Sequence, residues 1–201
     1  MRRPRPAHVL AVVPVCALVL VAGCGERAAQ TEAATPATTT ATSSTVVSEE
    51  TTDAPPFPAD TALDTADAVL GEGPTVVTGI RAGTQDGFAR VVFDISGTTV
   101  PGWYVTYVDA PVDDANGALF DVPGSAFLQV SIRPVANPYM DPGVAEAATG
   151  GIPAETGPVV GLFYASVYEG QALAYVGLTA ERPFRVFSLT DPTRIVVDVQ
   201  D

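Results

Sequence analysis

The chain has 201 residues and a formal net charge of −13 at pH 7. This length allows one ordinary domain together with flexible tails. Nucleic-acid binding requires clustered cations, so we expect no nucleic-acid partner for so acidic a chain. The same charge excludes attachment to an anionic membrane surface through basic residues alone.

Several residue types that carry chemistry are missing. The sequence contains no Lys, its single His is His8, and its two Cys are Cys16 and Cys24. Without an N-terminal segment, the chain keeps no His and at most one thiol. This removes His-based acid–base catalysis, Ser–His and Cys–His nucleophiles, Schiff bases and ordinary zinc sites. We therefore expect no catalytic residue, no metal and no cofactor, although chemistry based on carboxylates alone remains open.

Residues 1–23 have the pattern of an export signal peptide. Three Arg in the first five positions precede an apolar stretch, Val9–Ala22, that is shorter than the roughly 20 residues of a membrane-spanning helix. The stretch ends in LVAGC, which resembles the bacterial lipobox and assigns Cys24 as the lipid-attachment residue. This predicts an exported protein that its N-terminal lipid anchors to the outer face of the cytoplasmic membrane. The alternatives are a plain secretory signal with an incidental Cys24 and a short uncleaved anchor.

Residues 24–74 have the composition of a disordered linker. They are rich in Thr, Ala and Pro and contain one aromatic residue, Phe57. Such a composition buries too little apolar surface to offset the entropy lost on ordering. As a flexible coil the segment spans roughly 40 Å, enough to hold a domain away from a membrane.

Residues 75–201 are predicted to form an all-β domain. Apolar alternation and turn residues place strands at 75–80, 88–95, 102–108, 126–133, 159–168, 172–178, 184–189 and 194–199. This pattern favours an antiparallel β-sandwich of about eight strands, preceded by the disordered tether. The Pro- and Gly-rich segment 134–158 is predicted to be a long irregular loop, and loops of this length are usually functional or mobile.

The second and last predicted strands repeat one pattern, in which an Arg precedes an Asp by four residues on the same strand face. In an antiparallel pair, Arg90 lies opposite Asp198 and Asp94 lies opposite Arg194, whereas a parallel pair would oppose like charges. We therefore predict that these strands are antiparallel neighbours joined by two structural ion pairs, each contributing about 0.2–1 kcal/mol. The alternative is that Arg90 and Arg194 bind glycan hydroxyls or peptide carboxylates. Arg185 is expected to be a solvated residue of the outer face.

Three aromatic residues are candidates for stacking on sugar rings: Trp103, Tyr104 and Tyr107. Alternation along the strand puts Trp103 and Tyr107 on one face, which is the core face in the competing interpretation. A buried Trp103 would remove the sugar-stacking hypothesis for that face. The adjacent carboxylates Asp113 and Asp114 point to opposite sides of an extended strand, so they do not flank one bond as glycosidase carboxylates do.

Three segments resemble a known family: 88–97 (FARVVFDISG), 169–177 (EGQALAYVG) and 184–199, which contains DPTRIVVD. They are similar to the AMIN and AMIN-like domains, and the closest likeness is to AMIN-like lipoproteins of high-GC Gram-positive bacteria. The resemblance covers residues 75–201. It implies a β-sandwich that localises proteins in the cell envelope through peptidoglycan. The zinc-dependent amidase module that accompanies AMIN domains elsewhere is not expected, because no His is available to build it.

We therefore expect a non-catalytic envelope lipoprotein whose domain binds peptidoglycan or another envelope component. One alternative is a scaffold or adaptor for an envelope protein complex. A second alternative is a glycan-cleaving enzyme that uses two carboxylates.

Overall fold

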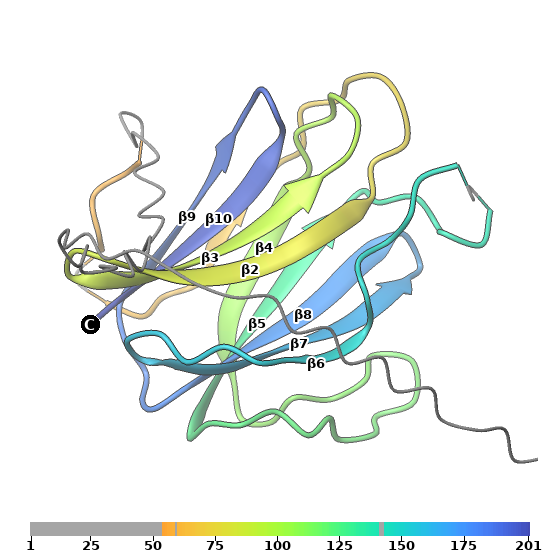
Figure 1. Cartoon of the computed structure of the whole chain (residues 1–201). Coiled ribbons are helices and arrows are strands. Elements are labelled where there is room, and N and C mark those ends of the chain that lie inside the picture. The colour runs from red at the N-terminus through yellow and green to blue at the C-terminus, as the bar shows by residue number, and fades with distance from the viewer. Residues whose placement is uncertain (1–53, 59, 141–142) are drawn as a thin grey trace, which may run out of the picture. The chain divides into compact units, whose positions relative to one another are not determined.

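The computed structural model describes residues 54–58, 60–140 and 143–201. The expected signal peptide, the expected lipid-attachment residue Cys24 and the linker up to residue 53 lie outside these residues. All regular secondary structure in the described part is β-strand (Figure 1). No helix in that part is long and apolar enough to cross a membrane.

The strands form two antiparallel sheets that pack as a sandwich (Figure 1). The large sheet has the order β1-β4-β5-β8-β7-β6, and the small sheet has the order β2-β3-β10-β9. The bounds are β1 (Asp64–Ala66), β2 (Val77–Gln85), β3 (Phe88–Ile95), β4 (Gly102–Val108), β5 (Ala126–Arg133), β6 (Gly150–Ile152), β7 (Val159–Tyr168), β8 (Gln171–Leu178), β9 (Phe184–Leu189) and β10 (Arg194–Gln200). The predicted antiparallel β-sandwich is confirmed, and each of the eight predicted strands is present.

The hydrophobic core lies between the two sheets. Alternate residues of each strand point inward, because successive side chains of a strand face opposite sides. Buried Val, Leu, Ile and Phe side chains of both sheets meet there, and β3, β5 and β10 contribute, among others, Val91, Phe93, Leu128, Val130, Ile195 and Val197. The set of inward positions fixes which residues remain for the outer faces.

The predicted register between β3 and β10 is confirmed. Arg90 is opposite Asp198, and Asp94 is opposite Arg194, in an antiparallel pair at the centre of the small sheet. β3 also pairs with β2, and β10 with β9, so this pair forms the centre of the small sheet.

Two hairpins have two-residue turns. Asp86 and Gly87 connect β2 to β3, and Glu169 and Gly170 connect β7 to β8. The φ angles of Gly87 (82°), Glu169 (49°) and Gly170 (78°) are positive. Two-residue turns with positive φ match the right-handed twist of the flanking strands, which explains the Gly at the second turn position.

The ordered domain begins before the predicted boundary at Thr75, so the expectation of a disordered linker up to residue 74 is wrong for its last part. β1 pairs with β4, and Val69 forms a bridge with Val100. The physical reason is that composition describes a segment on average, whereas a few backbone bonds to an unpaired sheet edge are enough to order a short segment.

Asp64 of β1 connects the two sheets through hydrogen bonds to β4 and β9. Its Oδ1 accepts a hydrogen bond of 2.8 Å from the indole Nε1 of Trp103 on β4. Its Oδ2 accepts a hydrogen bond of 3.1 Å from the backbone N–H of Val186 on β9. One carboxylate therefore joins an edge region of the large sheet to an edge strand of the small sheet.

The long loop 134–158 is less irregular than expected, because it contains β6, which pairs with β7. Backbone bonds also attach the loop to the start of the small sheet, from Ala136 N to Thr75 O (2.7 Å) and from Ala147 N to Val77 O (2.8 Å). Periodicity could not reveal β6, since a three-residue strand with two glycines has no measurable alternation.

Replacement of Asp64 by Ala is expected to detach β1 and destabilise the sandwich. Each lost hydrogen bond to the carboxylate contributes about 1.5–3 kcal/mol to the free energy of unfolding. Trp103 is the only Trp, so its fluorescence reports on this contact directly, and its emission should shift to longer wavelength. Chemical denaturation followed by fluorescence measures both effects. The matched control is Asp67→Ala at an exposed position; equal behaviour of the two variants would contradict the role of Asp64.

Candidate functional site

The Arg–Asp motif of β3 and β10 belongs to a cluster of charged side chains on the outer face of the small sheet. The strand register aligns Arg90 of β3, Asp198 of β10 and Arg185 of β9 in one row across three strands. The neighbouring row along the same face consists of apolar residues, Val92, Val196 and Phe187.

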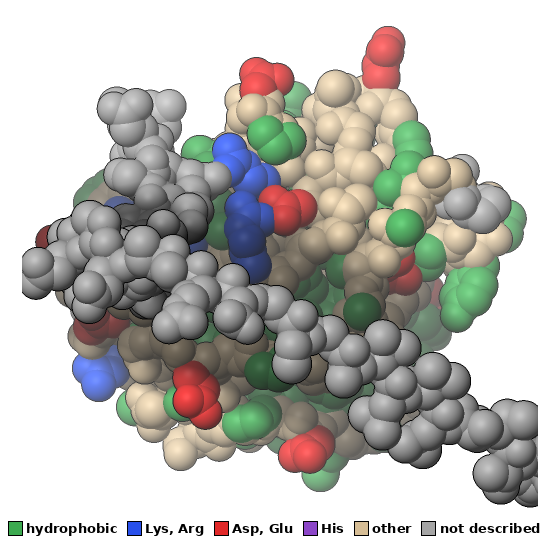
Figure 2. All heavy atoms as spheres, viewed as in Figure 1, with side chains coloured by type: hydrophobic (Ala, Val, Ile, Leu, Met, Phe, Trp, Pro, Cys, Tyr) green, Lys and Arg blue, Asp and Glu red, His purple; other side chains and the backbone are tan. Residues whose placement is uncertain are grey.

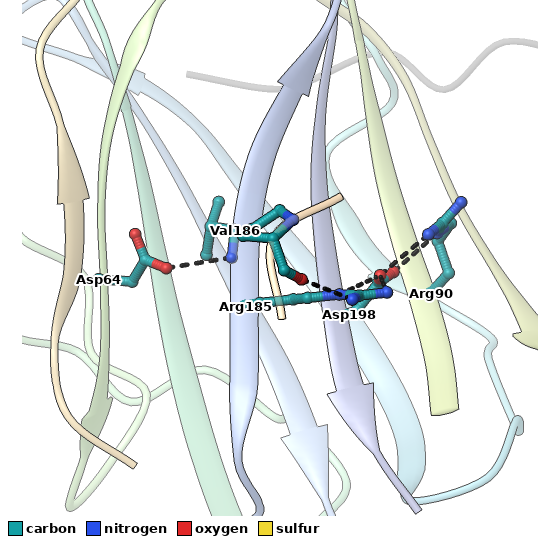
Figure 3. Close-up of polar contacts among 6 residues, drawn as sticks. Asp64, Arg90, Arg185, Val186 and Asp198 are labelled. Atoms are coloured by element: carbon teal, nitrogen blue, oxygen red, sulfur yellow. Dashed lines mark hydrogen bonds and ion pairs between the residues drawn. The ribbon is translucent and has the colours of Figure 1, made fainter. Parts of the chain in front are cut away.

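Asp198 accepts hydrogen bonds from both guanidinium groups (Figure 3). Arg90 binds it through two parallel bonds, from Nε to Oδ1 at 2.7 Å and from Nη2 to Oδ2 at 2.9 Å. Arg185 donates from Nε to Oδ2 at 2.9 Å, and its Nη2 lies 2.8 Å from the same oxygen. Paired bonds between guanidinium and carboxylate are among the strongest hydrogen bonds in proteins.

Aromatic rings surround the two guanidinium groups. Arg90 lies 5.3 Å from the ring centroid of Phe88 and 5.5 Å from that of Phe187. Arg185 lies 4.2 Å from the ring centroid of Phe57 and 5.1 Å from that of Phe88. Cations at such distances are attracted to the ring face, and the rings also keep water away from the ion pairs.

The cluster is buried, which corrects the sequence-based expectation. The side chains of Asp198, Arg90 and Arg185 are 0%, 5% and 13% exposed. Arg90 and Asp198 therefore form a desolvated pair, and the expected energy for solvated cross-strand pairs does not apply. The expectation that Arg185 is a solvated outer-face residue is wrong, because it shares the buried carboxylate. Among the described residues, no buried side-chain nitrogen or oxygen lacks a hydrogen-bond partner.

A segment expected to be part of the linker completes the cluster. Arg185 donates from Nη1 to the backbone carbonyl of Pro55 at 2.6 Å. The ring of Phe57 packs edge-on against Phe88, with centroids 5.6 Å apart. Ala54 packs on the apolar row next to the cluster. Sequence reasoning missed this contact; the lone aromatic residue in the linker was the available signal.

The second predicted ion pair has a different geometry. Asp94 lies opposite Arg194 as expected, but its carboxylate forms an ion pair with Arg81 of β2. Nε of Arg194 donates to the backbone carbonyl of Pro192 at 3.3 Å. Side chains at the edge of the sheet reach diagonally to a neighbouring strand, which register alone does not predict. Figure 2 shows one face of the molecule on which Arg side chains lie together beside an acidic one.

The three aromatic candidates lie on the two faces of β4 as the alternation predicts, with Trp103 and Tyr107 on one face and Tyr104 on the other. Trp103 is 9% exposed and belongs to the core, so its assignment as a sugar-stacking residue is wrong. Tyr107 packs against Phe184, and its hydroxyl donates to the carbonyl of Arg182 at 2.8 Å. Burial is the main cause that raises the pKa of Tyr107 above its usual value. Tyr104 points to the opposite side and is 39% exposed.

A second polar cluster lies at β7. Tyr164 and Ser166 both donate hydrogen bonds to Oε1 of Glu146, at 2.7 Å and 2.9 Å. Burial, reinforced by the hydrogen bond to the Glu146 carboxylate, raises the pKa of Tyr164 far above its usual value. Ser166 has a φ of 87° next to a register shift in β7. The arrangement ties the long loop to the sheet through one carboxylate.

Metal sites and grooves are the other candidate sites to consider in the described ranges. No group of three or more His, Cys, Asp or Glu side chains is arranged there to hold a metal ion. A groove of about 620 Å³ lies at β6, and Asp121, Glu155, Ile152, Val160 and Leu162 are among the residues that line it.

An antiparallel sandwich with an Arg–Asp–Arg row on its smaller sheet is thus the class of domain that the structure defines. The family model of the AMIN-like domain matches residues 75–201, well over half of the chain, and the chain belongs to this family. This confirms the resemblance at the level of the domain. Neither the curated proteins nor the solved structures contain a match to the chain.

Replacement of Asp198 by Asn is expected to destabilise the domain strongly. The amide has nearly the same shape but removes the charged carboxylate that binds two buried guanidinium groups, and breaking a buried ion pair in this way costs about 3–5 kcal/mol of the free energy of unfolding. Urea denaturation measures the change.

Asp94→Asn is the matched control, because it removes the carboxylate of an ion pair on the same sheet face whose side chains are 48% and 37% exposed. Solvent screening limits its effect to about 0–1 kcal/mol. Similar small losses for both variants would contradict the central role of the buried carboxylate.

Proposed function

We propose that this chain is a non-catalytic cell-envelope protein whose AMIN-like domain binds peptidoglycan or another envelope component. The observation that carries the proposal is the match of the AMIN-like family model over residues 75–201, since this family is associated with the envelope. In the same proposal the protein is exported and a lipid on Cys24 anchors it to the outer face of the membrane. The apolar N-terminal stretch that ends in LVAGC supports this part.

The chemistry of the chain supports binding rather than catalysis. Beyond Cys24 the sequence contains neither His nor Lys. The carboxylate of Asp198 is buried between two guanidinium groups, and that of Glu146 accepts bonds from two hydroxyls. Carboxylates engaged in this way stabilise the fold and are not presented to a substrate.

Tyr104 is the residue that we propose for glycan contact. Its exposed ring lies on the outer face of β4, and Thr106 follows on the same face. Gln129 of β5 is opposite Thr106 in the strand register. A phenol ring flanked by a hydroxyl and an amide suits a sugar, because the ring covers the apolar face of a hexose and the polar groups bind its hydroxyls.

An adaptor role is the second candidate, and a different observation favours it. Tyr139 and Met140 are adjacent in the long loop and are 91% and 79% exposed. Exposed aromatic and Met side chains are common at protein–protein contacts. Crosslinking in cells at position 139, compared with position 168 on β7, would identify a protein partner.

Tyr104→Ala is expected to reduce retention of the intact chain on purified peptidoglycan by about three- to tenfold, since one aromatic contact contributes roughly 0.5–1.5 kcal/mol. Sedimentation with peptidoglycan at low salt measures the retained fraction, and Tyr168→Ala is the control at another exposed Tyr. No retention of the wild-type chain would reject wall binding. Release of muropeptides by the wild-type chain would contradict a non-catalytic role.

Cys24→Ser is expected to move the protein from the membrane fraction to the soluble extracellular fraction, because the thiol is the acceptor of the lipid in this proposal. Fractionation with an immunoblot measures the distribution, and Cys16→Ser is the matched control within the signal segment. Membrane retention of the Cys24→Ser variant would favour an uncleaved anchor.

A further inference from the structure

The five residues Ala54–Pro58 lie on the outer face of the small sheet although they precede every strand of the described chain. We propose that the surface around Arg185 is a docking site for extended peptides that combine proline and phenylalanine. In this structure the chain's own Ala54–Pro58 is the occupant. A segment of the same chemistry in another protein would compete for the surface. The proposal is independent of peptidoglycan binding.

A single backbone carbonyl gives the segment its polar anchor. The carbonyl of Pro55 accepts the hydrogen bond of 2.6 Å from Nη1 of Arg185, which leaves Nε and Nη2 of the same guanidinium for Asp198 (Figure 3). Pro55, Pro56 and Pro58 have no backbone N–H, so the segment brings few donors that need a partner. Their fixed φ angles also reduce the entropy that the peptide loses on docking, as in other recognition of proline-rich peptides.

The phenylalanine provides the apolar anchor. The ring of Phe57 lies over the guanidinium of Arg185, at 4.2 Å from Cζ to the centroid, and packs edge-on against Phe88. Next to it, Ala54 contacts the buried apolar row formed by Val92, Phe187 and Val196. The surface thus recognises three features of the segment: a carbonyl, an aromatic ring and a small apolar residue.

The charge of the surface suits this ligand. Arg90 and Arg185 both bind the carboxylate of Asp198, so the row consists of two cationic side chains and one anionic side chain. The segment itself is uncharged, and Asp53 and Asp60 flank it in the sequence. An anionic side chain inside the segment would have to displace the aromatic ring of Phe57 to reach the guanidinium of Arg185.

The docking contacts do not form part of a sheet. Ala54–Pro58 belongs to no strand, and it contacts the sheet through the hydrogen bond from Arg185 and through ring and side-chain contacts. Such a segment can leave its site while the strands of the sandwich stay paired. Because it is part of the same chain, it competes with an external peptide at an effective concentration of about a millimolar or more.

The test uses the intact chain and a dye-labelled peptide with the sequence of residues 52–60. In the Phe57→Ala chain the internal occupant is weakened, so we expect it to bind the peptide at least about tenfold more tightly than the wild-type chain does. Fluorescence anisotropy measures the affinity. A control peptide with Ala in place of its phenylalanine should bind at least about tenfold more weakly, because it lacks the ring that covers Arg185.

Arg185→Lys in the Phe57→Ala background keeps the positive charge beside Asp198 but removes the planar guanidinium that contacts both the carbonyl and the ring. We expect peptide binding to be lost while the variant still unfolds in one cooperative transition with unchanged Trp103 emission, although its unfolding midpoint falls because Asp198 loses the paired bonds of Arg185. Unchanged binding, or equal binding of the control peptide, would overturn the proposal. Absence of peptide binding to the Phe57→Ala chain would overturn it as well. A wild-type dimer that Phe57→Ala dissociates would overturn the assignment of the segment to its own chain.

Discussion

The small sheet depends on the buried carboxylate of Asp198. Two guanidinium groups from the flanking strands donate to it, and the three residues occupy one row across β3, β10 and β9. A carboxylate that is fully removed from water is stable only with such partners, so a shift of either neighbouring strand by one residue would leave charges buried and unpaired. The cluster therefore specifies the register of the sheet in addition to stabilising it.

The sequence was sufficient to predict the antiparallel pairing of β3 and β10, because two Arg–Asp repeats with equal spacing satisfy each other in only one direction. It was also sufficient for the eight strands with clear alternation. It did not reveal the burial of the Arg90–Asp198 pair, since burial on an outer face depends on what covers that face. Phe57 and Pro55 lie in a stretch whose composition indicates disorder, and β1 and β6 are too short to show a period.

For the candidate binding residues, too, the sequence pattern did not reveal which side chains are buried. Alternation correctly separated Tyr104 from Trp103 and Tyr107, but it could not say which side faces the core. Tertiary packing determines which face of β4 is turned to the core. The hydrogen bond from Trp103 to Asp64 is an example, because its partner lies 39 residues earlier in the chain. Contacts between residues far apart in sequence determine which of the candidate binding residues are exposed, and local sequence patterns carry no information about these contacts.

The contacts of the N-terminal segment with Arg185 are the first that a mechanical load from the N-terminal side of the domain would meet. A pull transmitted from the N-terminal side reaches the Pro55 and Phe57 contacts with Arg185 first, then the carboxylate of Asp64, and only afterwards the long β-ladders. The early contacts are few, whereas the ladders share the force among many backbone bonds. A pull from the N-terminal side would therefore break these few contacts before it loads the β-ladders of the sandwich.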